Sequence, residues 1–138
     1  MIERNKRVAE LIAREVSLVL EFKINDDRLK NVTIIRAEIS KDLRYCKIFF
    51  SVIAIKNGSL YDTQDNTYSE YIEKEVKKVM NGFKSSKHFI KKEVFSKVLL
   101  RLIPDLSFEY DPGIEQSSKI LKIINDNNKI INDNNQRQ

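Results

Sequence analysis

The chain has 138 residues, of which 41% are hydrophobic and 33% are charged, and these proportions exclude a disordered chain and predict one globular domain. Its 25 Lys and Arg residues outnumber its 20 Asp and Glu residues, and the net charge of +5 favours an anionic partner: nucleic acid, an acidic protein or a membrane surface. The single cysteine, Cys46, excludes an internal disulfide and is expected to be buried and reduced.

The N-terminal segment, residues 2 to about 23, is predicted to form a helix because apolar residues recur at helical spacing from Val8 to Leu20. The segment begins with a charged sequence, so no signal peptide is expected and the expected location is the cytoplasm. The longest apolar run, residues 48–55, is too short to span a bilayer.

Two strands are expected after a polar break at residues 25–31. Residues 32–40 are rich in β-branched side chains, and residues 45–55 alternate between apolar and polar positions. The short polar connection between them predicts an antiparallel hairpin. A turn-rich loop is expected at residues 56–66.

Two helices are predicted next, from about residue 67 to 83 and from about residue 84 to 102. Breaks between them are expected at Asn81-Gly82 and at residues 85–88, because these short stretches are rich in residues typical of turns. Pro104 is expected to end the second helix.

Three further features complete the predicted architecture. Leu106, Phe108 and Tyr110 alternate with polar residues and predict a third strand. Residues 114 to about 124 are expected to form a last helix, and the Asn- and Asp-rich residues 125–138 a flexible tail. The pattern is satisfied by a single α+β domain, residues 1–124, in which helices cover one face of a three-stranded sheet.

The helix predicted from residue 84 to about 102 gathers positive charge. Six cations and one anion give it a local excess of +5; they are Lys84, Lys87, Lys91, Lys92, Lys97, Arg101 and Glu93. Apolar residues recur every four positions from Ile90 to Leu102 and predict that one side packs on a core. Such a helix is typical of a phosphate-binding surface, although a solvated lysine-rich face is the commoner explanation of a charge run taken alone.

Five segments in order resemble ribosome-binding factor A, a family of bacterial assembly factors for the small ribosomal subunit. They are RVAELIAREV at 7–16, DRLKNVTI at 27–34, ISKDLRYCKIFFSV at 39–52, KHFIKKEV at 87–94 and LRLIPDLSFEYD at 100–111. The resemblance implies a type II KH-like domain of order α-β-β-α-α-β with an extra C-terminal helix. It also implies a non-catalytic protein that binds the small ribosomal subunit and its rRNA during late maturation and rRNA processing.

In this family the break between the two central helices carries an Ala-x-Gly signature, which the resemblance places at Ser86-Lys87-His88. Ser86 stands for the alanine and His88 for the glycine. KH domains hold the backbone of about four nucleotides at this break. Phosphate is therefore expected to meet the N–H groups at the start of the second helix and the charges of Lys87 and its neighbours. Asp27 replaces the usual proline of an Asp-Pro-Arg sequence, which predicts a looser loop.

The full set of residues predicted to bind RNA combines this break with cations of neighbouring elements. It comprises Lys6, Arg7, Arg14, Arg28, Lys41, Arg44, Lys47, Lys84, Ser86, Lys87, His88, Lys91, Lys92 and Arg101. Ordinary structural roles remain open for several members: an ion pair with Glu10 for Arg14, surface cover of the sheet for Lys47, and turn chemistry around Arg28 and Arg44.

No nucleotide-binding or metal-binding motif is present, so no cofactor, metal or small-molecule substrate is expected. The protein is expected to be a monomer without a membrane partner. Two other functions stay open. One is a protein-interaction module for an acidic partner, and the other is a metal-dependent nuclease that uses Asp26, Asp27, Asp42 or Asp105.

Overall fold

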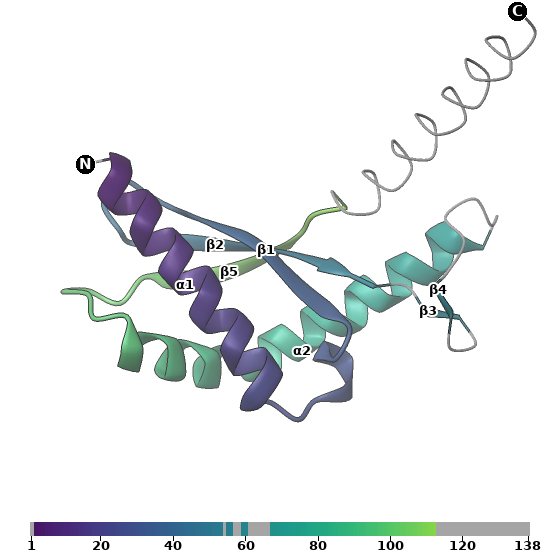
Figure 1. The fold of residues 1–138 in the computed structure, drawn as a ribbon. Coiled ribbons are helices and arrows are strands. Elements are labelled where there is room, and N and C mark those ends of the chain that lie inside the picture. Colours follow the sequence, from purple (N-terminus) through teal and green to yellow (C-terminus); the bar gives the residue numbers. More distant parts are fainter. Residues whose placement is uncertain (1, 54, 57–58, 61–66, 113–138) are drawn as a thin grey trace, which may run out of the picture.

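A computed structural model describes residues 2–53, 55–56, 59–60 and 67–112 (Figure 1). In chain order the elements are α1 (Ile2–Phe22), the short 3-10 helix η1 (Asp27–Leu29), β1 (Val32–Ile39), β2 (Tyr45–Val52), β3 (Ile55–Lys56), β4 (Ser59–Leu60), α2 (Tyr68–Lys97) and β5 (Asp105–Tyr110). The predicted N-terminal helix and three strands are confirmed. The predicted helix at 114–124 and the tail at 125–138 lie outside the described residues.

The main sheet has the strand order β1-β2-β5. β1 and β2 pair antiparallel, as the short connection predicted, with a bulge at Ile35 between the pairs Ile34–Phe50 and Arg36–Phe49. β2 and β5 pair parallel. This is possible because the long crossover through α2 returns the chain to the end of the sheet at which β2 begins. Within the predicted loop at 56–66, two residues of β4 pair with β3 as a small antiparallel ladder.

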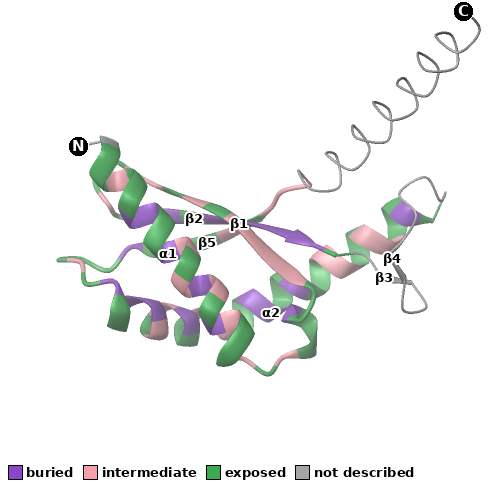
Figure 2. Ribbon diagram, in the orientation of Figure 1, coloured by how far each residue is buried: buried purple, intermediate pink, exposed green. Residues whose placement is uncertain are grey.

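Both long helices cover the same face of this sheet (Figure 1). Ile12 and Val16 of α1 are fully buried, as are Ile90 and Val94 of α2, and they meet alternate residues of β2 such as Phe50. Figure 2 shows the buried stretches on both helices and along β2. The alternation of β2 and the helical period of α1 and α2 therefore meet in one core.

Aromatic side chains join α2 to the sheet. The Phe83 ring stacks on Phe108 at a centroid distance of 4.0 Å and meets Phe50 edge-on at 5.1 Å. Cys46 lies in the same core with no exposed surface, as expected, and burial raises the pKa of its thiol to about 12.

The two helices predicted at 67–83 and 84–102 are one continuous helix, so the predicted break between them is wrong. α2 runs without interruption to Lys97 and ends where Val98 turns to an extended backbone. Gly and Ser each lower helix stability only modestly, and core contacts on both sides of residues 85–88 outweigh that cost. Figure 1 shows instead that α2 changes direction between its teal first half and its greener second half.

Gly82 has a packing role in this helix. A Cβ atom at this position would lie 2.9 Å from Cδ2 of Leu29 and 3.3 Å from Cβ of Arg28. The absent side chain therefore lets η1 approach the helix closely enough for Leu29 to be buried.

Candidate nucleic-acid interface

The cations of the second half of α2 line up along one exposed side of the helix. Positions 84, 87–88 and 91–92 follow each other at spacings of three and four residues, so their side chains are neighbours. The loop after the helix adds Arg101, which is exposed. We call this set the basic surface; its members are Lys84, Lys87, His88, Lys91, Lys92 and Arg101.

One carboxylate from β5 reaches the basic surface. Oδ1 of Asp105 lies 3.1 Å from Nζ of Lys87 and 3.8 Å from Nζ of Lys91. The backbone N–H of Asp105 donates to the carbonyl oxygen of Arg44 over 2.8 Å. The backbone of Arg44, in the turn before β2, is thereby placed beside Asp105, while its guanidinium faces Asp42 at 3.7 Å.

A groove lies between α2 and the loop that follows it. Its volume is about 470 Å³, and it is lined by His88, Lys91, Lys92, Phe95, Ser96 and Ile103. Phe95 is almost buried and provides an apolar wall, while the lysines stand at its edge. Apolar walls beside cations suit an unstacked base and its phosphate.

The sequence predictions missed the apolar part of this groove. The spacing predicts a helix to about residue 102, but α2 ends at Lys97. The side chains of Leu99, Leu102 and Ile103 are 84%, 64% and 59% exposed. Pro104 disfavours helical backbone only at residue 103 and so allows a helix up to residue 102, and no local signal in the sequence marks the end at Lys97.

The predicted phosphate contact with a helix N-terminus is not available in this structure. Ser86, Lys87 and His88 lie in the interior of α2, where each N–H group bonds to the carbonyl four residues earlier. Any phosphate contact here must come from side chains. Ser86 and Lys87 are half-buried, and His88 is exposed.

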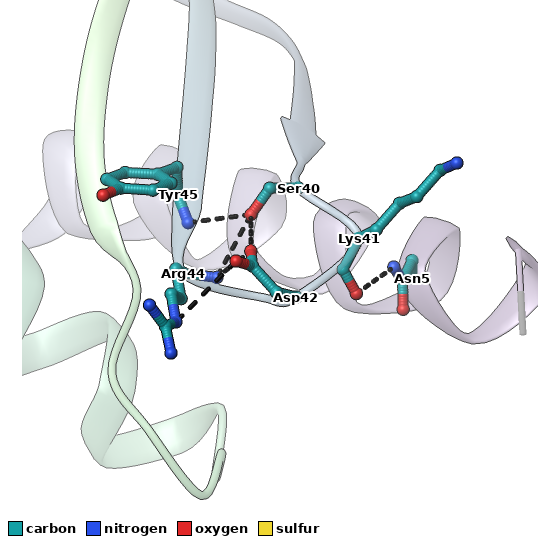
Figure 3. Close-up of polar contacts among 6 residues, drawn as sticks. All are labelled: Asn5, Ser40, Lys41, Asp42, Arg44 and Tyr45. Carbon is teal, nitrogen blue, oxygen red and sulfur yellow. Dashed lines mark hydrogen bonds and ion pairs between the residues drawn. The ribbon is translucent and has the colours of Figure 1, made fainter.

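The turn between β1 and β2 is held by its own hydrogen bonds (Figure 3). Ser40 Oγ donates to Asp42 at 2.7 Å and accepts from the backbone N–H groups of Arg44 and Tyr45. The hydroxyl of Ser40 and the N–H of Arg44 lower the pKa of the Asp42 carboxyl. In Figure 3 the side chains of Lys41 and Arg44 extend in different directions, so this turn does not present both to one ligand.

Lys47 lies on the other side of the sheet, which we call the outer face. There Nζ of Lys47 lies 3.5 Å from Glu109, and the guanidinium of Arg36 lies 2.6 Å from Asp111 and 4.0 Å from the ring centre of Phe49. Arg36 thus covers Phe49, which is only 8% exposed. The outer face pairs its cations with carboxylates and lies apart from the basic surface.

The remaining predicted residues also lie away from the basic surface. Arg28 pairs with Asp26 at 2.7 Å beside η1, and this contact lowers the pKa of the Asp26 carboxyl. The cations of α1 are exposed at Lys6, Arg7 and Arg14. Lys6 and Lys41 border a separate groove of about 760 Å³ between α1 and β1, whose lining also includes acidic residues.

Two features are absent from the described parts of the chain. No three His, Cys, Asp or Glu side chains in residues 2–53, 55–56, 59–60 and 67–112 are grouped to hold a metal ion. No helix in those ranges combines the length and the apolar character needed to cross a bilayer.

Sequence comparisons identify one family. The family model described as Ribosome-binding factor A matches residues 4–124. Proteins named ribosome-binding factor A from Acetivibrio thermocellus and Staphylococcus carnosus are 35% and 32% identical to the chain over 126 residues. Both alignments cover 91% of this chain, and they cover 89% and 95% of the respective relative.

Solved structures show a similar fold. The crystal structure of ribosome-binding factor A from Thermus thermophilus superposes with a TM-score of 0.56 at 13% identity, over 77% of this chain and 94% of that one. The solution structure of a putative ribosome binding factor A from Thermotoga maritima gives 0.50 at 17% identity, over 78% and 83% of the two chains. These likenesses support the KH-like α+β fold.

Proposed function

The chain belongs to the ribosome-binding factor A family, and on this basis we propose that it is a non-catalytic assembly factor that binds the small ribosomal subunit. Its ligand is the rRNA of that subunit, during late maturation and rRNA processing in the cytoplasm. Tighter binding to an immature rRNA conformation biases rRNA folding, because a ligand shifts a conformational equilibrium only through a difference in affinity.

The observation that carries this proposal is the basic surface beside an apolar groove. Phosphate contacts to the lysines supply affinity, and an unstacked base between Phe95 and Ile103 supplies part of the specificity. Arg101 adds positive charge on the loop after α2, whereas the guanidinium of Arg44 already faces Asp42 at 3.7 Å within its own turn. Lys47 and Arg28 contribute little, since neither lines the groove: Lys47 lies on the outer face and Arg28 in η1.

The contacts of the acidic residues favour RNA binding over hydrolysis. A metal-dependent nuclease needs several carboxylates around one ion. Asp26 and Asp27 pair with Arg28 and Lys30 beside η1, Asp42 is bonded within its turn, and Asp105 pairs with lysines of α2. Their separation supports a binding role.

Co-sedimentation of the purified chain with small ribosomal subunits, over a salt series from about 50 to 200 mM, tests the proposal. Lys87, Lys91 and Lys92 are changed together to Glu in the test variant. We expect wild-type binding to weaken steeply with salt and the variant to bind about a hundredfold more weakly, because three phosphate contacts become repulsive.

The matched control reverses three exposed lysines on the first half of the same helix, Lys74, Lys77 and Lys78. It changes the net charge equally and should retain most of the affinity. Equal losses in the two variants would show that total charge matters and the basic surface does not. Failure of the wild-type chain to bind subunits even at low salt would overturn the proposed function.

A further inference from the structure

Asp105 lies between the basic surface and the sheet, at the first position of β5. A single oxygen, Oδ1, faces the ammonium groups of Lys87 at 3.1 Å and of Lys91 at 3.8 Å. The hydrogen bond from its backbone N–H to Arg44 fixes the start of the strand. The carboxylate therefore already engages two of the lysines to which the proposed function assigns rRNA phosphate.

The other cations of the basic surface are placed differently. Lys84, Lys92 and Arg101 are exposed and have no ion-pair partner within the described parts of the chain. Phosphate can contact these three without displacing a protein group. At Lys87 and Lys91 it must replace Asp105 or lie next to it, and two anions that share one ammonium repel each other.

Fold stability does not explain this contact. The side chain of Asp105 is 56% exposed, and ion pairs between exposed groups contribute little to stability. The larger consequence is electrostatic, because one negative charge lies within 4 Å of two lysines of the surface that gathers cations.

We propose that Asp105 competes with rRNA phosphate for Lys87 and Lys91, and so lowers the affinity of the basic surface and keeps its binding reversible. The inference rests on the proposed function, since it assigns the same ligand to the same surface. It divides that surface into open cations and two lysines at which phosphate must displace Asp105 or be repelled by it.

The test measures binding of the full chain to a fluorescent oligouridylate and, separately, to small ribosomal subunits. Asp105→Asn keeps the side-chain shape and removes the charge. We expect this variant to bind up to about fivefold more tightly than wild type near 0.1 M salt, the upper end of the effect of one exposed ion pair. The gain should shrink as added salt screens the charges.

Glu109→Gln is the matched control. Glu109 lies on the same strand, its side chain is 52% exposed against 56% for Asp105, and it pairs with Lys47 on the outer face. Four residues of strand separate the two carboxylates by about 13 Å. That distance exceeds the screening length of about 10 Å at 0.1 M salt, so this variant should bind like wild type.

A double-mutant cycle shows whether Asp105 acts through the two lysines. Asp105→Asn is combined with Lys87→Gln and Lys91→Gln, and the gain should disappear in that background. Thermal unfolding of each variant checks the fold, and Asp105→Ser is a second neutral variant that retains the backbone hydrogen bond to Arg44.

Unchanged or weaker binding by Asp105→Asn would overturn the inference, and weaker binding would show that Asp105 only positions the lysines. A gain that persists without the lysines would also overturn it. A gain on oligouridylate from a chain that fails to bind subunits would support the competition and refute the proposed function, so the two failures are distinguishable.

Discussion

Exposed cations occur both on the outer face of the sheet and on the basic surface, but on the basic surface carboxylates match only some of them: Asp105 faces Lys87 and Lys91. On the outer face, Arg36 pairs with Asp111 at 2.6 Å and Lys47 with Glu109 at 3.5 Å. On the basic surface, Lys84, Lys92 and Arg101 have no such partner in the described ranges. On the proposed function, the cations open to phosphate are those near which no other element brings a carboxylate.

The geometry of strands and helices explains why cations are paired more often on the outer face than on α2. Neighbouring strands bring side chains of separate sequence segments within reach, so Lys47 meets Glu109 from β5. Along a helix only residues three or four positions apart meet, and the second half of α2 contains a single acid, Glu93. Lys23 of the segment after α1 engages that acid at 2.8 Å.

The largest expected effect comes from removing the packing that holds α2, and with it the basic surface, on the sheet. Phe83→Ala removes a ring that stacks on Phe108 and contacts Phe50, and should cost about 3–5 kcal/mol of unfolding free energy. Chemical denaturation followed by circular dichroism measures it. A loss below about 1 kcal/mol would show that α2 is held mainly by other contacts.

A smaller effect should come from reversing one charge on each surface. Lys92→Glu should weaken binding to small ribosomal subunits about tenfold, because it replaces an open cation of the basic surface by an anion. Lys47→Glu should change the affinity less than about twofold, because Lys47 already pairs with a carboxylate on the outer face. Fluorescence anisotropy at one salt concentration compares them, and equal losses would remove the distinction between the surfaces.

The smallest expected effect, on thermal stability, comes from removing the ion pair between Lys23 and Glu93. The hydrogen bond from Lys23 holds the pKa of the Glu93 carboxyl below its ordinary value of 4.5. A carboxyl whose pKa is lowered in the folded state stabilises the fold at every pH above its ordinary pKa. That stabilisation is lost as the pH falls through the lowered pKa. Glu93→Gln should thus lower the thermal midpoint slightly at pH 7 and by less at pH 3.

Thermal unfolding of both chains at the two pH values makes this comparison. A difference between wild type and Glu93→Gln that stays the same at pH 3 would mean that packing of the side chain, and not its charge, is responsible. Lys23→Gln is the reciprocal variant and should lose the same pH-dependent part.

Much of the fold was predictable because the local periodicity of apolar residues determines it. The helical spacing in α1 and the alternation in β2 and β5 gave the elements and the side that faces the core. The junction within α2 was not predictable in the same way. Gly82 and the serines after it resemble a break, but Gly82 instead lies against Leu29, a contact that the sequence does not reveal.

The candidate site was predicted in part. Lys84, Lys87, His88, Lys91 and Lys92 share one side of α2 because their spacing is helical, and this follows from the sequence alone. That Lys47 lies on the opposite side of the sheet follows from strand alternation only once the helices are known to cover a single face. The groove wall formed by Ile103 depended on where α2 ends.

Local sequence was enough to define most of the elements, their core-facing residues and the concentration of cations on one helix, because each depends on neighbours within a few positions. Tertiary packing selected which of those cations face a carboxylate. Lys87 and Lys91 meet Asp105 only because the parallel pairing of β5 with β2 returns residue 105 to the side of α2. Contacts between residues distant in sequence arise from packing, and no local pattern records them.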